Sequence, residues 1–192
     1  LNGAALTAGS TTSAVTGVDG VASFTNLVTE TAGTGYTLTF NADAAGVANV
    51  DSDLFDVTAA AATSIEFTAI GSPQVAGIPF SVTLNAVDDF GNVDGSYAES
   101  ADLTTTAGTV DPLTAAFTNG TVTLDVSVTQ SGTGQTITAS GETSGVTGLS
   151  NTFDVEPGAV SASGSSITAS SPHTADGSDA STVTIVLLDA NG

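Results

Sequence analysis

The sequence predicts an all-β protein made of tandem β-sandwiches of about 100 residues each. Two observations lead to this prediction. The first is that segments such as 80–87 and 121–128 alternate apolar with polar residues, which is the period of a strand with one buried face. The second is that motifs of one region of the chain return later in the same order, which is typical of repeated structural units.

Turn-forming clusters separate the alternating segments. Residues 18–20, 89–92 and 176–178 are rich in Asp, Asn, Gly and Ser, which favour tight turns. The alanine-rich run 58–63 is too short for a stable helix and has no cap, so it is interpreted as a linker. The strands expected between the turns of the middle unit are 64–70, 79–88, 97–106, 113–117, 120–129, 134–140 and 151–156.

Four motifs carry the internal repetition. Each occurs twice, about 100 residues apart, and the order along the chain is the same. The pairs are Gly33-Thr34-Gly35 with Gly132-Thr133-Gly134, Phe55-Asp56-Val57 with Phe153-Asp154-Val155, Ser72-Pro73 with Ser171-Pro172, and the turn from Asp88 to Gly91 with the turn from Asp189 to Gly192. A period of this length with about seven short strands is the size of one immunoglobulin-like β-sandwich.

The repeat divides the chain into three segments. Residues 58–157 are expected to form a complete immunoglobulin-like repeat. Residues 1–57 carry the C-terminal part of a preceding immunoglobulin-like repeat, and residues 158–192 carry the N-terminal strands of a following one. Because half a sandwich leaves an apolar face and an open edge, we expect both end segments to be completed, either by flanking sequence or by strands of another chain.

Three signatures together cover nearly the whole chain. They are the run from Thr11 through Asp19-Gly20-Val21 and Phe24 to Gly33-x-Gly35-Tyr36, the Phe-Asp-Val strand that closes each copy, and Thr174-Ala175-Asp176-Gly177 followed by Val183-Thr184-Ile185 and Asp189-Ala190-Asn191-Gly192. In these signatures the chain resembles the bacterial immunoglobulin-like repeats of invasin- and intimin-type adhesins and related large surface proteins. The resemblance implies a stalk-like array of sandwiches outside a bacterial cell. Its partners would be neighbouring copies of the same repeat and other subunits of a fibre.

The charge balance excludes several functions. The chain has 20 Asp and Glu residues and no Lys or Arg, which gives a formal net charge of −20 at pH 7. A polyanion without permanent cations cannot hold phosphate, so nucleic-acid binding and docking on an anionic membrane are excluded. No apolar stretch approaches the length of a membrane-spanning helix, so no membrane insertion is expected in this segment.

One turn has the composition of a calcium-binding loop. Calcium takes about six to eight oxygen ligands from carboxylates, amides and carbonyls. The turn offers Asp88, Asp89, Asn92 and Asp94, which are the candidate metal ligands, with calcium as the candidate cofactor. The alternative is that Asp, Asn and Gly serve here only as turn formers, and the spacing differs from that of an EF-hand loop.

The chain is predicted not to be an enzyme. His173 is the single residue that ordinarily titrates near neutral pH, and it follows Pro172 in an expected loop. Catalysis would require a nucleophile and an orienting acid to converge on it, and the other copy has Gln74 at the equivalent position. The two Gly-x-Gly turns lack the third glycine and the helix of a dinucleotide-binding loop. No catalytic or cofactor-binding residue is therefore assigned.

The predicted function is that of a structural, non-catalytic repeat segment of a long extracellular bacterial surface protein, such as an adhesin stalk, a filament or a surface layer. The alternative is a carbohydrate- or partner-binding immunoglobulin-like module accessory to a secreted enzyme. Such a module would present aromatic platforms in its loops, and only Phe90 and Tyr97 lie in or beside loops. The sequence therefore favours the structural role.

Overall fold

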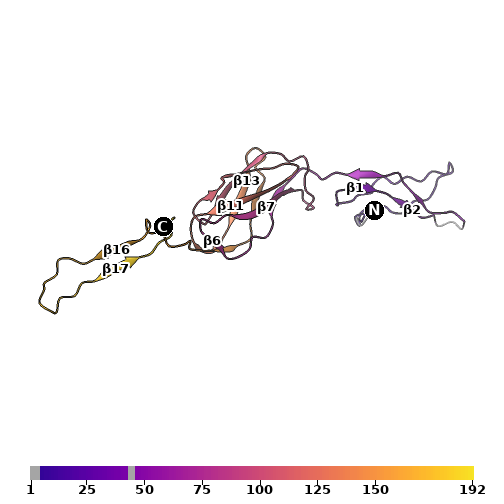
Figure 1. The fold of residues 1–192 in the computed structure, drawn as a ribbon. Coiled ribbons are helices and arrows are strands. Elements are labelled where there is room, and N and C mark those ends of the chain that lie inside the picture. Colours follow the sequence, from indigo (N-terminus) through magenta and orange to yellow (C-terminus); the bar gives the residue numbers. More distant parts are fainter. Residues whose placement is uncertain (1–4, 43–45) are drawn as a thin grey trace.

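The computed structural model describes residues 5–42 and 46–192. Within these residues the protein is all-β and contains no helix, as the alternating segments predict. Figure 1 shows an elongated arrangement in which packed sheets occupy the middle. A paired-strand segment lies on the N-terminal side, and a two-stranded hairpin extends on the C-terminal side. The expected N-terminal segment is thus only partly covered, since residues 1–4 and 43–45 lie outside the described residues.

Two four-stranded antiparallel sheets form the middle of the molecule. The first has the order β5 (Ser64–Phe67), β7 (Phe80–Val87), β11 (Thr121–Val128) and β9 (Val110–Asp111). The second has the order β10 (Thr114–Ala116), β8 (Ser100–Thr105), β13 (Ile137–Gly141) and β14 (Thr147–Leu149). A third sheet places β15 (Phe153–Glu156) between antiparallel β12 (Gly132–Gln135) and parallel β6 (Gln74–Val75). A strand occurs in each of the seven expected segments.

The core lies between the two larger sheets, and the alternation of residue types places it there. Along β7, Val82 and Leu84 point into one buried cluster, while the neighbouring Ser81 and Thr83 are on the other face. The same cluster contains Leu103 from the opposite sheet. Each large aliphatic side chain buried in this way contributes about 1.5–3 kcal/mol to folding, so the burial of the apolar faces holds the two sheets together.

Aromatic side chains close the two ends of the core. Phe153 on β15 is among the largest fully buried side chains, and its ring packs edge-on against Phe80 with the centroids 5.8 Å apart. Tyr97 packs edge-on against Phe117 at 5.1 Å. The sequence places Tyr97 beside a loop, but its side chain is buried, because its ring packs on Phe117 in the core cluster.

The two larger sheets approach each other very closely at one edge. A Cβ atom on Gly148 of β14 would overlap the carbonyl oxygen of Ile65 on β5. Glycine is therefore required at this position by the close approach of two backbones, not by an unusual φ angle.

The N-terminal segment repeats the local geometry of the central one. Strand β1 (Gly33–Tyr36) pairs with β4 (Phe55–Val57) in the same shifted register in which β12 pairs with β15. In both copies the amide of the second glycine donates to an aspartate on the partner strand, Gly35 to Asp56 and Gly134 to Asp154, each at 2.9 Å.

A reciprocal pair of hydrogen bonds to a serine also recurs in both segments. Beside the short pair β2 (Thr39–Phe40) and β3 (Val50–Asp51), the amide of Leu38 donates to Ser52 Oγ at 3.0 Å, and the Ser52 amide donates back to the Leu38 carbonyl. In the central segment the amide of Ile137 donates to Ser150 Oγ at 2.9 Å, and the Ser150 amide donates back to the Ile137 carbonyl. The sequence motifs therefore return together with their hydrogen bonds.

The C-terminal hairpin of β16 (Ser166–Ala169) and β17 (Val183–Val186) is paired as β5 is paired with β7. Ile65 opposes Ala86 in the central segment and is buried, whereas Ile167 opposes Ile185 in the hairpin and both are more than half exposed. The hairpin thus has the strand pairing of β5 and β7, and the described residues do not cover its apolar face.

Residues 5–32 contain no strand, although the repeat pattern predicts strand-forming segments there. The central strand equivalent to residues 21–28 is β11, which is paired along its length with β7. No described segment supplies a corresponding partner along residues 21–28, so their backbone makes only isolated bonds, such as Thr7 N–H to the Val28 carbonyl at 2.8 Å. A strand needs a partner as well as an alternating sequence.

Candidate functional site

The turn that follows β7 contains all four candidate metal ligands. Its fold is set by Gly91, whose φ of 81° is unfavourable for residues with a side chain, and by a pair of backbone bonds. The Asp88 amide donates to the Asn92 carbonyl at 2.9 Å, and the Gly91 amide donates to the Asp88 carbonyl at 3.1 Å. The turn brings Asp88, Asn92 and Asp94 together near the linker that precedes β5.

Asp88 is 4% exposed and each of its carboxylate oxygens accepts hydrogen bonds. Oδ1 accepts from the amides of Phe90 and Asn92, both at 2.9 Å. Oδ2 accepts from the amide of Ala60 at 3.1 Å. The side-chain Nδ2 of Asn92 donates to both oxygens, at 3.1 and 3.0 Å. One carboxylate thus organises the turn and also holds the incoming linker.

Two further aspartates contact the same linker. Asp94 is buried, its Oδ2 accepts from the Ala62 amide at 3.0 Å, and its Oδ1 accepts from the amide and hydroxyl of Ser96. Asp89 is exposed and accepts from the Thr63 hydroxyl at 2.8 Å. The alanine-rich run is therefore an extended linker fixed by carboxylates, in agreement with its interpretation from the sequence.

The turn aspartates have lowered pKa values. The pKa of Asp88 falls to about 2, chiefly because the Asn92 side-chain amide donates to the carboxylate; burial opposes the shift, and the backbone amides of Asn92, Ala60 and Phe90 reinforce it. The pKa of Asp94 is also lowered, first by the Ser96 hydroxyl, again against the effect of burial. Both side chains therefore accept these bonds as carboxylates at neutral pH.

Acid should weaken the turn. A pKa lowered in the folded state means that the stability from Asp88 is fully present above its unfolded value near 3.8 and is lost as the pH falls toward about 2. We expect the urea midpoint of the chain to fall over this interval. In Asp88→Asn it should be lower at pH 6 and should change less between pH 4 and 2. Asp125→Asn, which removes an exposed carboxylate outside the turn, is the control; the same flattening there would contradict the assignment to Asp88.

Calcium at this turn stays a prediction. The oxygens of Asp88 and Asp94 already face N–H and O–H donors of the chain, so a cation would compete with those donors. Across residues 5–42 and 46–192, no group of three or more His, Cys, Asp or Glu side chains is placed to hold a metal ion. The structure shows that these aspartates bind the linker, a role that their composition did not reveal.

Cations should stabilise the protein, because its 20 carboxylates repel one another without Lys or Arg to balance them. Added NaCl should raise the melting temperature by screening this repulsion. If calcium binds the turn, it should raise the melting temperature further than magnesium at equal ionic strength, and Asp88→Ala or Asp94→Ala should remove the difference. If calcium and magnesium raise the melting temperature equally, and both variants respond as the unmodified chain does, general screening is the sole cause and the turn is not a calcium site.

His173 lies in the connection between β16 and β17 and contacts both a serine and an aspartate. Its Nε2 is 2.8 Å from Ser170 Oγ, and its Nδ1 is 3.0 Å from Asp179 Oδ1. In a chain so rich in Ser and Asp, one of these residues is expected near any histidine. The structure brings one of each to it, in the order of a nucleophile, a base and an orienting acid.

The surroundings of this cluster favour a structural interpretation. Ser170 Oγ also accepts from the Thr182 amide at 2.9 Å, as Thr68 Oγ1 accepts from the Thr83 amide at 3.2 Å at the equivalent point of the central sheet. The serine, the histidine and the aspartate are all exposed on the hairpin. Acyl transfer also requires oxyanion donors in a site that excludes water. The described residues show a loop fastened by side chains rather than such a site.

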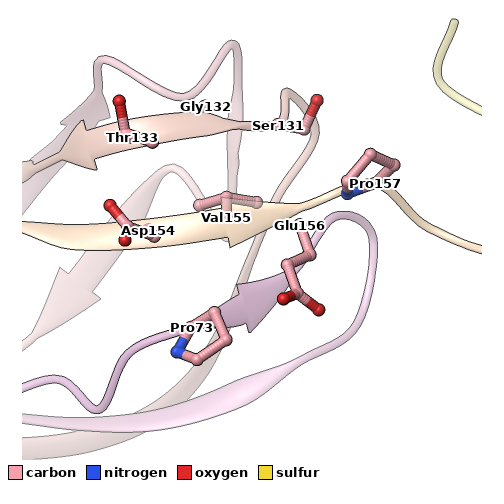
Figure 2. A pocket seen from close by; sticks show the side chains of 8 residues that line it. All are labelled: Pro73, Ser131, Gly132, Thr133, Asp154, Val155, Glu156 and Pro157. Atoms are coloured by element: carbon pink, nitrogen blue, oxygen red, sulfur yellow. The ribbon is translucent and has the colours of Figure 1, made fainter.

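A shallow hollow on the third sheet is drawn in Figure 2. Asp154 and Glu156 from β15 lie there beside residues of β12. The lining residues are small or acidic: Pro73, Ser131, Gly132, Thr133, Asp154, Val155, Glu156 and Pro157. None is aromatic, so this hollow offers no platform for a sugar ring. Of the two aromatics that the sequence places in or beside loops, only Phe90 is exposed, at 59%.

A polar cluster surrounds Glu99, and the sequence did not predict it. The Glu99 carboxylate accepts from the Tyr97 hydroxyl at 2.6 Å, from the Thr143 amide at 3.1 Å, and from the hydroxyl of Ser144. These donors lower the pKa of Glu99 to about 2, the Ser144 hydroxyl most strongly, and burial raises the pKa of Tyr97. The Tyr-x-Glu spacing places two side chains on one face of an extended segment, but nothing in the sequence indicates that residues 143–144 contact Glu99. The cluster fastens that loop.

Comparison with known protein families, with curated proteins and with solved structures finds no match. Within the described ranges there is also no helix that is both long and apolar enough to span a bilayer.

Proposed function

We propose that the chain is a structural, non-catalytic repeat segment of a long extracellular bacterial surface protein, such as an adhesin stalk, a filament or a surface layer. The observation that carries the proposal is the return of the same hydrogen bonds in successive segments. The pairing of β1 with β4 and of β12 with β15 in one register is one example, and the reciprocal hydrogen bonds of Ser52 and Ser150 are another. Tandem immunoglobulin-like sandwiches would produce this recurrence, and arrays of such units suit an extended structure.

The linker contacts recur as well, which supports an array in which units are joined in the same way. Asp189 Oδ2 accepts from the Gly158 amide at 2.8 Å, as Asp88 Oδ2 accepts from the Ala60 amide. Asp189 Oδ1 accepts from the amides of the next residues in its turn, as Asp88 Oδ1 does in the other copy. In both copies, an aspartate that follows the second strand holds the segment that enters its own unit.

The partners proposed for the segment are neighbouring copies of the same repeat. The hairpin of β16 and β17 exposes Ile167, Val183, Ile185 and Leu187, which together form an apolar face. In the central sandwich, the second large sheet covers the equivalent face of β5 and β7. Leaving several such side chains in water costs about 1.5–3 kcal/mol each, so further strands of the fibre, from the same or another chain, are proposed to cover the hairpin.

Surface labelling of cells tests the proposal. Antibodies against residues 58–157 should label intact cells of the organism that makes the protein, without permeabilisation. Trypsin should leave this segment intact because it has no Lys or Arg, whereas proteinase K added outside should remove the label. Labelling that appears only after permeabilisation would contradict an extracellular role.

A further inference from the structure

The side chain of Asn92 joins the central sandwich to the N-terminal segment. Its Nδ2 donates to the carbonyl of Glu30 at 2.8 Å, and its Oδ1 accepts from the amide of Ala32 at 2.9 Å. A single amide thus binds one C=O and one N–H of the same short segment. Because both a donor and an acceptor must align, the contact fixes the direction of that segment as well as its position.

Both sides of this contact are held in place. On the central side, the Asn92 backbone and side-chain nitrogens donate to Asp88. On the N-terminal side, the Tyr36 hydroxyl donates to the Ala32 carbonyl at 3.3 Å, and the Tyr36 ring is buried against Gly33, where a Cβ would overlap the hydroxyl. The Asn92 contact therefore connects two ordered pieces of structure.

The covalent connection between the two pieces is fixed separately. Asp88 binds the Ala60 amide and Asp94 binds the Ala62 amide, so the linker lies against the central sandwich. A linker alone permits rotation of one unit about the other. A second attachment, made by Asn92 from the same turn that holds the linker, restrains that rotation.

The chemistry of asparagine suits this position. The chain has no Lys or Arg, so a cationic side chain cannot bridge its anionic surfaces. An aspartate at position 92 would face the Glu30 carbonyl and the Asp88 carboxylate with no proton to donate. A neutral amide supplies a donor and an acceptor without adding charge.

We propose that Asn92 is the latch of a joint between successive units, and that its binding partner is the backbone of residues 30–32, in the loop that precedes β1. The joint fixes the orientation of the N-terminal segment on the central sandwich. A role of this joint in stiffening a stalk rests on the proposed function. The joint itself rests only on the contacts of Asn92, Asp88 and Asp94.

Spin-label distances test the joint in the full chain. The sequence has no cysteine, so Thr34→Cys on β1 and Thr104→Cys on β8 provide the only two labelling sites. Electron–electron dipolar spectroscopy should give one narrow distance distribution. Asn92→Ala and Asn92→Asp should broaden it about twofold or more, because the units then move over a range of orientations.

Two further variants keep the test decisive. Asn151→Ala is the matched control, since its amide binds the N–H and C=O of Ile70 at 2.8 and 3.0 Å within the central sandwich; it should lower the melting temperature without broadening the distribution. Ala32→Pro removes the donor from the other side and leaves the turn at Asn92 intact, so it should broaden the distribution with no loss of stability in the central sandwich.

A broad distribution in the unmodified chain, or one that neither Asn92 variant changes, would overturn the joint. Broadening by Asn151→Ala to the same extent would also overturn it, because general loosening would then be the cause. A failure of surface labelling would leave the spin-label result unchanged, so the joint and the proposed function are tested independently.

Discussion

Phe153→Ala is expected to lower the free energy of unfolding by about 3–5 kcal/mol, which is the usual cost of removing a buried phenylalanine ring. Phe153 is 2% exposed, and its ring fills the core where β15 meets β7 and packs on Phe80. Surrounding strands can relax only in part around the lost volume, so a cavity remains. For a domain of this size the loss is a large fraction of the total stability.

Urea denaturation followed by tyrosine fluorescence measures this loss. Tyr36→Phe as the common background leaves Tyr97, which is buried in the central core, as the sole tyrosine. Phe90→Ala is the matched control, and its exposed ring should change the free energy by less than about 0.5 kcal/mol. Phe55→Ala removes the equivalent ring of the N-terminal segment, which is 36% exposed, and should have an effect smaller than that of Phe153→Ala. A loss below about 1 kcal/mol for Phe153→Ala would contradict the position of its ring in the core.

Gly148→Ala is expected to destabilise the protein by about 2 kcal/mol or more, although it adds a single methyl group. The methyl group would overlap the Ile65 carbonyl, and this atom belongs to a backbone that cannot rotate away as a side chain can. The edge of β14 must then separate from β5, which opens the core where the two sheets meet.

The control for this substitution is Gly95→Ala. No heavy atom lies within 4 Å of a Cβ built on Gly95, and its φ is not in the left-handed region, so alanine should be neutral or should stabilise by about 0.4–1 kcal/mol through the unfolded chain. The urea midpoints of the two variants should therefore move apart. Equal midpoints for Gly148→Ala and the unmodified chain would mean that β14 and β5 are not in contact.

The strands of the middle unit could be predicted from the sequence because alternation of apolar and polar residues directly records which face is buried. The short strands β6, β9 and β14 could not, since each lies outside the alternating segments and forms only against a neighbouring strand. The absence of strand structure in residues 5–32 has the same origin. Alternation indicates that a segment can pair, and the presence of a partner decides whether it does.

The candidate site shows the same limit. Composition identified the turn at Asp88, Asn92 and Asp94, because aspartate, asparagine and glycine together favour turns. It could not show that the carboxylates accept hydrogen bonds from the amides of Ala60 and Ala62, because residue type does not reveal which backbone amide a side chain will bind. A cluster of acidic residues in a chain without basic ones suggests a cation, and the structure shows in addition that N–H groups of the chain donate hydrogen bonds to these carboxylates.

The parallel pairing of β6 with β15 determines how the central sandwich would carry a pulling force. Strand β6 comes early along the chain of the sandwich, directly after β5, and β15 is its last strand. When the two ends are drawn apart, parallel strands slide along each other, so their hydrogen bonds are loaded together in shear rather than opened one at a time. The bond from the Ala76 amide to the Glu156 carbonyl, at 2.9 Å, and that from the Asp154 amide to Ser72 Oγ, also at 2.9 Å, lie across this pair and its continuation. Resistance to extension would therefore depend on the few hydrogen bonds that join these short strands.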